Sequence, residues 1–152
     1  MITRGASVLS LTRDLEIPVK VLVVAKEHSL RSMVSCFLAL LYPEVREAAD
    51  LSGVWRVLSS GFLPEIIVAG YERPGAEEEA LFRSMRNLQA LRRVPILVMA
   101  PVDCMDRRME WRKAGATCWI ERPFSSKELL EIMGMVVFNN ADKRSVDELA
   151  VD

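Results

Sequence analysis

The sequence predicts an α/β protein in which a parallel β-sheet is covered by helices on both faces. Segments of strand and helix character alternate five times between residues 18 and 138. The strand segments are short, apolar and rich in β-branched residues, as expected of strands that are buried on both faces. Segments with apolar residues at intervals of three and four separate them, and this alternation is typical of parallel strands joined by helical crossovers.

Five short runs are the predicted strands, at residues 19–24, 44–49, 65–69, 95–99 and 117–121. The run at 44–49 is the most polar, so we expect it close to an edge of the sheet. The run at 65–69 stops at Gly70 and continues into a turn closed by Pro74 and Gly75. Ligands and chemistry lie at the carboxyl ends of strands in open α/β sheets. The absence of a side chain at position 70 therefore bears directly on function.

Between the strands, apolar residues recur at helical spacing. The clearest case follows Ser29, a predicted N-cap, and places on one helix face Leu30, Met33, Val34, Phe37, Leu38 and Leu41. Further helices are predicted at residues 50–60, 76–91 and 103–114, and a capping-box pattern from Ser125 to Glu128 precedes the last helix. We expect residues 1–17 to be an N-terminal extension and 18–138 the single folded domain. Residues 139–152 are predicted to be an acidic tail, either loose or folded as a short docking helix.

The composition is that of one soluble globular domain. Of the 152 residues, 51% are hydrophobic and 27% are charged, which indicates neither disorder nor a fibrous repeat. A net charge of -1 argues against a general nucleic-acid binder, which needs excess lysine and arginine to neutralise phosphates. Three cysteines without C-x-x-C spacing, Cys36, Cys104 and Cys118, predict buried thiols in a reducing compartment. No apolar run is long enough for a membrane span or a signal peptide, so we expect a cytoplasmic protein that does not contact membranes.

Several separate features resemble the receiver domain of response regulators in two-component signalling. They are the Ser-Leu-Arg opening of the first helix at residue 29, the Pro-Gly pair at 74, the Gly-Ala pair at 115, and Arg122 followed by Pro-Phe-Ser. These features occur between residues 18 and 138 in the order and spacing of that family. The resemblance implies a three-layer, doubly wound fold of the flavodoxin type, with five parallel strands in the order 2-1-3-4-5.

Phosphorylated members of this family need five groups at the carboxyl end of the sheet. An aspartate accepts the phosphoryl group, an acidic pair after the first strand holds Mg²⁺, and a hydroxyl residue and a lysine after later strands bind the phosphoryl oxygens. By resemblance, these positions fall on Ala25 and Lys26 for the acidic pair, Gly70 for the aspartate, Ala100 for the hydroxyl residue and Arg122 for the lysine. The sequence therefore predicts a degenerate pseudo-receiver with no catalytic residue, metal or cofactor.

Two of the substituted positions carry a positive charge. Lys26 forms either a fixed ion pair with Glu72 or Glu27, in place of metal and phosphate, or an exposed contact of little energetic weight. Arg122 is expected to pair with a neighbouring carboxylate, because its planar guanidinium does not replace the point charge of a lysine. The resemblance also makes the Arg122–Pro123 bond a candidate for the cis form. His28 is predicted to start a helix, since no nucleophile accompanies it for a catalytic triad.

A surface for protein partners is predicted around the fourth helix. Trp119 falls where receivers carry the aromatic side chain that turns inward or outward as they switch, and here it is either a core residue or a fixed interface residue. Nearby lie residue types that are common at binding hot spots, namely Arg107, Arg108, Trp111, Arg112 and Lys113. The alternative is that these residues form a solvated basic helix face that binds no partner, because such a face has the same composition. We expect a signalling protein of a histidine-kinase pathway, or a second copy of the chain, to bind this surface.

These observations predict an atypical response regulator that acts through phosphorylation-independent protein–protein interaction and is not an enzyme. The alternative is a small-ligand sensor or enzyme that reuses the cleft at the ends of the first, third and fourth strands. There Ala25, Gly70 and Ala100 leave space that larger side chains would fill. Nucleotide binding has no support, because neither glycine-rich phosphate motif occurs. No output domain is encoded, so DNA binding would have to come from another chain.

Overall fold

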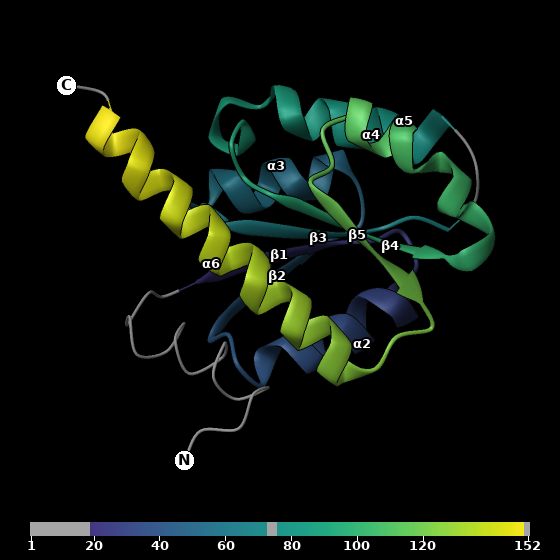
Figure 1. The fold of residues 1–152 in the computed structure, drawn as a ribbon. Helices are drawn as coiled ribbons and strands as arrows, with labels where there is room; N and C mark the ends of the chain where they lie inside the picture. Colours follow the sequence, from purple (N-terminus) through teal and green to yellow (C-terminus); the bar gives the residue numbers. More distant parts are fainter. Residues whose placement is uncertain (1–18, 73–75, 151–152) are drawn as a thin grey trace, which may run out of the picture.

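The computed structural model describes residues 19–72 and 76–150, and the predicted N-terminal extension lies outside them. The strands are β1 Lys20–Val24, β2 Glu44–Ala48, β3 Ile66–Gly70, β4 Ile96–Pro101 and β5 Cys118–Arg122. The helices are α2 His28–Ala39, α3 Leu51–Ser59, α4 Ala76–Asn87, α5 Arg108–Lys113 and α6 Ser126–Ala150, with the 3-10 helices η1 Gln89–Leu91 and η2 Val102–Arg107. Figure 1 shows three layers, with the sheet between two groups of helices.

The sheet confirms the predicted topology. All five strands pair in parallel in the order β2-β1-β3-β4-β5. β2 lies at one edge, as its polar sequence indicated, and exposes Arg46 and Glu47. The register aligns Val24 of β1 with Ala48 of β2 and with Ala69 of β3, so these three strands end at the same level. Their carboxyl ends form one side of the candidate site.

Each central strand contributes side chains to two hydrophobic clusters, one on each face of the sheet. In β1, Val21 and Val23 belong to the cluster that includes residues of α2 and α6, whereas Leu22 and Val24 belong to the cluster that includes residues of α3, α4 and α5. None of these four side chains is more than 1% exposed. Burial on both faces is the reason why the strands read as continuous apolar runs in the sequence.

The first helix begins at His28, with Glu27 at the N-cap position and no capping hydrogen bond from its side chain. The prediction that Ser29 caps this helix is therefore wrong, while His28 starts a helix as expected. Leu30, Val34 and Leu38 are buried as predicted, but Met33 is 42% exposed. The buried residues recur at every fourth position, and Met33 lies beside that narrow stripe.

The segments predicted as the third and fourth helices are both interrupted. α4 ends at Asn87, and the short helix η1 follows it. Residues 102–107 form η2, so only the six residues of α5 are α-helical in the predicted fourth helix. Short 3-10 segments have poor hydrogen-bond geometry and depend on tertiary contacts. Such contacts come from distant parts of the chain, and helical periodicity does not reveal them.

The final helix is longer than the sequence indicated. α6 runs to Ala150, although a separate tail was expected from residue 139. Its start agrees with the predicted capping box, since the backbone N–H of Glu128 donates to Ser125 Oγ at 3.1 Å. Residues 139–150 contain neither glycine nor proline, so no helix breaker stops the helix. Figure 1 shows its carboxyl end extending past the sheet. Within the described ranges, no helix is long and apolar enough to cross a membrane.

The cysteines do not all lie in the core. All three are free thiols; Cys104 is buried, Cys118 is half-buried and Cys36 is exposed, so the expectation of buried thiols is wrong for Cys36. Burial raises the pKa of Cys118 to about 11. A thiol with so high a pKa is poorly reactive near neutral pH, because the thiolate is the nucleophilic form.

Candidate functional site

The positions predicted to carry the degenerate phosphorylation site lie at the carboxyl end of the sheet, but they do not all meet. Ala25 directly follows β1, and Gly70 ends the neighbouring β3. Lys26 is exposed, and Arg122 ends β5. Ala100 lies inside β4, where it is fully buried in the cluster that packs against α4 and α5. The structure therefore brings Ala25 and Gly70 together, whereas Ala100, which follows the strand partner of Gly70, belongs to the cluster on the other face of the sheet from Ala25.

The direction in which a side chain of Gly70 would project is filled by apolar neighbours. A Cβ atom built on Gly70 would lie 3.1 Å from Ala25 Cβ and 3.2 Å from Leu30 Cδ2. Both distances are shorter than ordinary van der Waals contacts, so a side chain at position 70 requires its neighbours to shift. Ala25 and Leu30 are themselves buried. The position is therefore closed by packing, in addition to lacking an acceptor group.

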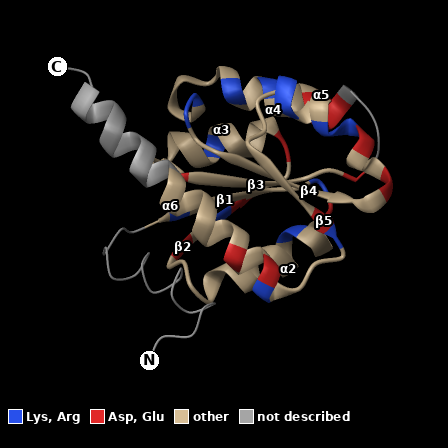
Figure 2. Cartoon of the chain, viewed as in Figure 1, with Lys and Arg blue, Asp and Glu red and all other residues tan. Residues whose placement is uncertain are grey.

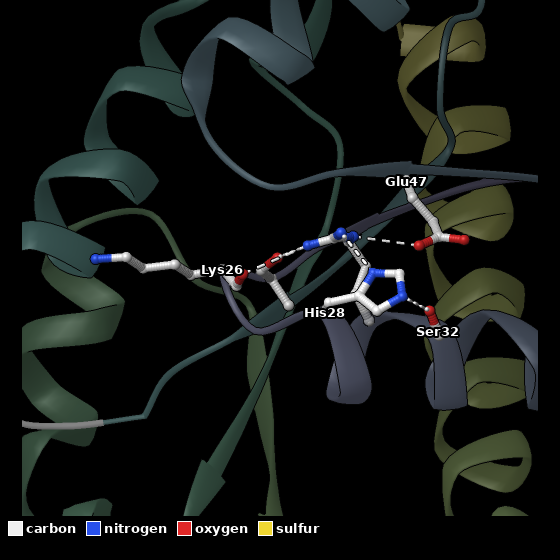
Figure 3. Close-up of polar contacts among 6 residues, drawn as sticks. Lys26, His28, Ser32 and Glu47 are labelled. Atoms are coloured by element: carbon white, nitrogen blue, oxygen red, sulfur yellow. Dashed lines mark hydrogen bonds and ion pairs between the residues drawn. The ribbon is translucent and has the colours of Figure 1, made fainter.

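Arg31 organises the loop between β1 and α2. Its guanidinium donates to the backbone carbonyl of Ala25 at 2.8 Å and to Glu47 Oε1 at 3.2 Å. A further contact of 3.1 Å joins Arg31 to His28 Nδ1, and His28 Nε2 lies 3.4 Å from Ser32 Oγ. Figure 3 shows these groups converging on one side of the loop. A permanent cation thus lies at the end of β1.

Lys26 points away from this cluster, toward α4 (Figure 3). Its Nζ lies 3.7 Å from Glu77 Oε1, and both side chains are strongly exposed. The predicted ion pair with Glu72 or Glu27 is therefore wrong, and the second possibility, an exposed contact, describes this lysine. Exposed pairs of this kind contribute about 0–1 kcal/mol. Lys26 therefore does not hold the site in one conformation.

Glu72 and Glu27 lie close enough together for Glu27 to affect the titration of Glu72. Burial and the nearby carboxyl group of Glu27 raise the pKa of Glu72, while the charge of Arg122 opposes the shift. Arg122 Nη2 donates to the backbone carbonyl of Tyr71 at 3.1 Å. Arg122 thus donates to the main chain, and it acts on the neighbouring Glu72 through its charge. The Arg122–Pro123 bond is cis, as the resemblance implied.

A buried carboxylate connects the end of β3 to η2. Glu79 of α4 is only 4% exposed, and it accepts hydrogen bonds from the hydroxyl of Tyr71 at 2.9 Å and from the guanidinium of Arg107 at 2.8 and 2.9 Å. Burial raises the pKa of Glu79, but the hydrogen bonds from Arg107 and Tyr71 and the charges of Arg107 and Arg83 outweigh it, so the pKa lies below its usual value. We call Tyr71, Glu79 and Arg107 the carboxylate clamp.

The predicted interface set divides into buried and exposed members. Trp111 is fully buried, and its ring packs edge-on against Tyr71 at 4.9 Å and against Trp119 at 6.1 Å between ring centroids. The expectation that Trp111 contacts a partner is therefore wrong, because α5 directs its indole into the core, while the other large apolar side chain of α5, Met109, is exposed. Arg107 is also engaged, by Glu79.

The remaining members of that set are accessible. Arg108, Arg112 and Lys113 are exposed, and Trp119 is half-buried. The guanidinium of Arg112 lies over the Trp119 ring at 5.3 Å, and Lys113 is 3.8 Å from Glu110. Figure 2 shows basic residues on the layer formed by α4 and α5. These four residues are called the α5–β5 face.

The predicted cleft is present, but only two of the three small residues expected to line it do so. Ala25 and Gly70 line a cavity of about 440 Å³. Ala100 is fully buried and does not line it. In the described part of the chain, no group of three or more His, Cys, Asp and Glu residues is arranged to hold a metal ion.

Sequence comparisons show only weak similarity to known proteins. No protein-family model matches the chain. The two-component response regulator ARR7 of Arabidopsis thaliana is 26% identical over 78 residues, which represent 51% of this chain and 38% of that protein. The chain thus spans less than half the length of this curated relative.

Solved structures of response regulators share this fold. The chemotaxis response regulator CheY4 of Vibrio cholerae is 26% identical, and the match covers 79% of this chain and 99% of CheY4 with a TM-score of 0.67. This chain has the fold of a response-regulator receiver domain. NtrX of Brucella abortus matches 88% of this chain with a TM-score of 0.77, at 20% identity and over 30% of NtrX. That second likeness bears on the fold alone.

Three residues that shape this receiver domain were not singled out from the sequence. Arg31 was noted only as part of the helix opening, Tyr71 only as part of a turn, and Glu79 only as one of three acidic residues in a first helical turn. Their importance comes from partners that are distant in the sequence, such as Arg107 for Glu79 and Trp111 for Tyr71. The one available signal was an aromatic residue directly after Gly70, where the site was expected.

Proposed function

We propose that this receiver domain acts in signal transduction without aspartyl phosphorylation, as a protein-interaction module and not as an enzyme. The observation that carries the proposal is Gly70, which stands at the acceptor position and has Ala25 and Leu30 packed where a side chain would project. The neighbouring positions support it, because Ala25 offers no ligand for Mg²⁺ and Lys26 adds an ammonium group. Arg31 already holds the carbonyl that follows β1.

The first test is chemical. Intact mass spectrometry after incubation with Mg²⁺ and acetyl phosphate is expected to show no adduct, with a phosphorylatable receiver domain as the positive control. Tryptophan fluorescence is expected to stay unchanged during titration with Mg²⁺ and beryllofluoride. A stoichiometric adduct that disappears in Glu27→Gln or Glu72→Gln would show that another carboxylate accepts the phosphoryl group, and the proposal would fail.

We propose the α5–β5 face as the surface that binds a partner, which is either a signalling protein of a two-component pathway or a second copy of the chain. Its support is the combination of exposed arginines with a half-buried tryptophan, since both residue types are enriched at hot spots. Because Trp111 fills the core behind this face, α5 has a fixed support.

The partner surface is tested by site-specific photo-crosslinking in cells. A photo-reactive residue at position 112 is expected to give discrete adducts, whereas the same residue at position 40, which is 74% exposed in wild type but lies on the other layer, is expected to give none. Arg108→Glu is expected to weaken the adducts formed at position 112. Equal crosslinking from both positions, or no effect of Arg108→Glu, would contradict this assignment.

A second candidate function is binding of a small ligand in the cleft beside Ala25 and Gly70. The observation that favours it is the cavity of about 440 Å³, whose size lies within the range of ligand pockets. This function does not depend on the α5–β5 face, and both can operate in one domain.

A further inference from the structure

The cavity beside Gly70 lies where the chain connections change direction. β1 and β3 are neighbours in the sheet, while the connections after them lead to helices on opposite faces. Open α/β sheets bind ligands at such a switch point, outside the carboxyl ends of the strands. The cavity opens there between the end of β1, the loop before α3 and the first turns of α4.

The inner wall of the cavity is apolar. Val24, Ala25, Leu51, Gly70 and Leu81 line it together with small side chains on the neighbouring loop and helix. Apolar walls favour an apolar body and disfavour a phosphate or a sugar, whose polar groups would lose hydration without finding partners. The wall therefore favours a ligand whose main part is a hydrocarbon chain or an aromatic ring.

The rim of the cavity has the opposite character. Four carboxylates line it, those of Asp50, Glu72, Glu77 and Glu78, against one ammonium group of Lys26. Asp50 Oδ1 is engaged by the backbone N–H of Gly53, and Lys26 is drawn to the exposed Glu77. Glu72 and Glu78 remain on the same side of the rim, and the charge of Glu78 helps to raise the pKa of Glu72.

Glu72 also presents an acceptor that the protein leaves unused. Its Oε1 atom is buried and has no hydrogen-bond partner. A buried acceptor without a donor has lost its hydration without compensation, and a donor supplied by a ligand removes that cost. A positively charged donor is favoured, because it also relieves the repulsion from Glu27 and Glu78.

From this combination we infer that the cavity binds a small organic cation, in which an ammonium head donates to Glu72 and an apolar body lies against Val24, Ala25 and Leu81. The inference rests on the second candidate function and names its ligand class. It is independent of the proposals about phosphorylation and the α5–β5 face, whose tests measure an intact mass and a crosslink and not ligand binding.

The probe is n-hexylammonium, titrated into the full chain and followed by ¹H–¹⁵N correlation spectra. Saturable shifts are expected at the backbone amides of Val24, Ala25, Gly70 and Leu81. Hexanoate has the same chain length and the opposite charge, and it is expected to cause no saturable shift at these amides. Lack of saturation by hexylammonium, or equal binding of hexanoate, would overturn the inference.

Two variants locate the binding. Ala80 lines the cavity from an exposed position on α4, so Ala80→Trp blocks the space without disturbing the core and is expected to abolish the shifts. Glu72→Gln is expected to weaken hexylammonium binding about tenfold, since a charge-assisted hydrogen bond is lost. Glu110→Gln removes a carboxylate elsewhere and is the matched control. Full binding by Ala80→Trp, or the same affinity for Glu72→Gln and Glu110→Gln, would place the ligand elsewhere and refute the site.

Discussion

Replacing Glu79 by alanine is expected to lower the free energy of unfolding by about 2–4 kcal/mol, because the variant loses charge-assisted hydrogen bonds at a buried position. Tyr71 and Arg107 both donate to this carboxylate, and it is 4% exposed. Without it, η2 loses its tie to α4, and the packing of Tyr71 against Trp111 is no longer anchored. Urea denaturation followed by tryptophan fluorescence measures the change.

The control for this prediction is Glu77→Ala, on the same helix. Glu77 is strongly exposed and has only the loose contact with Lys26, so its loss is expected to change stability by less than about 1 kcal/mol. Equal effects of Glu77→Ala and Glu79→Ala would show that the carboxylate clamp contributes no more than a surface pair.

The same carboxylate gives the clamp a defined pH dependence. Because the pKa of Glu79 is lowered in the folded protein, its stabilisation is fully present above the pKa of an unfolded glutamate, about 4.3, and is lost as the pH falls through the lower folded-state pKa. The difference in stability between wild type and Glu79→Ala is therefore expected to be largest near neutral pH and to shrink in acid. A difference that grows on acidification would contradict this assignment.

The fold was predictable because it depends on patterns that are local in the sequence. Runs such as residues 19–24 are apolar throughout, since β1 is covered on both faces. The polar run at 44–49 correctly indicated an edge strand. Helix ends were less predictable: η2 replaces part of a predicted helix, and α6 continues through a polar segment that was expected to be a tail. These boundaries depend on tertiary contacts and on the absence of helix breakers, which outweigh residue polarity.

The site was predictable in its positions but not in its contacts. The resemblance located Ala25, Gly70 and Arg122 at the ends of the correct strands. It did not reveal that Leu30 closes the space beside Gly70, or that Trp111 turns into the core. Both outcomes depend on which side chains meet across the sheet, and one sequence contains no direct record of such pairs. For the same reason the sequence allowed an exposed Lys26 but did not identify Glu77 as its partner.

Replacing Gly70 by aspartate is expected neither to create a phosphorylation site nor to preserve stability. Its Cβ atom must fit beside Ala25 Cβ and Leu30 Cδ2 at 3.1 and 3.2 Å. Overpacking of this kind costs about 1–3 kcal/mol. The gain from restricting the unfolded chain at a former glycine is about 0.4–1 kcal/mol, so a net loss of stability is expected. Incubation with Mg²⁺ and acetyl phosphate is expected to leave the intact mass of the variant unchanged, since the acidic pair is still missing.

Two further variants separate the possible causes of the stability loss in Gly70→Asp. Gly70→Ala adds only the Cβ atom, so it isolates the packing cost from the cost of the carboxylate. Leu30→Ala removes the methyl group that lies closest to the new side chain after Ala25, and it is expected to destabilise Gly70→Asp less than it destabilises wild type, because the two substitutions share one space. Additive effects would mean that Leu30 does not close the position. Phosphorylation of Gly70→Asp would mean that only the acceptor had been lost, since a site otherwise able to bind Mg²⁺ and phosphate would regain its chemistry from one carboxylate.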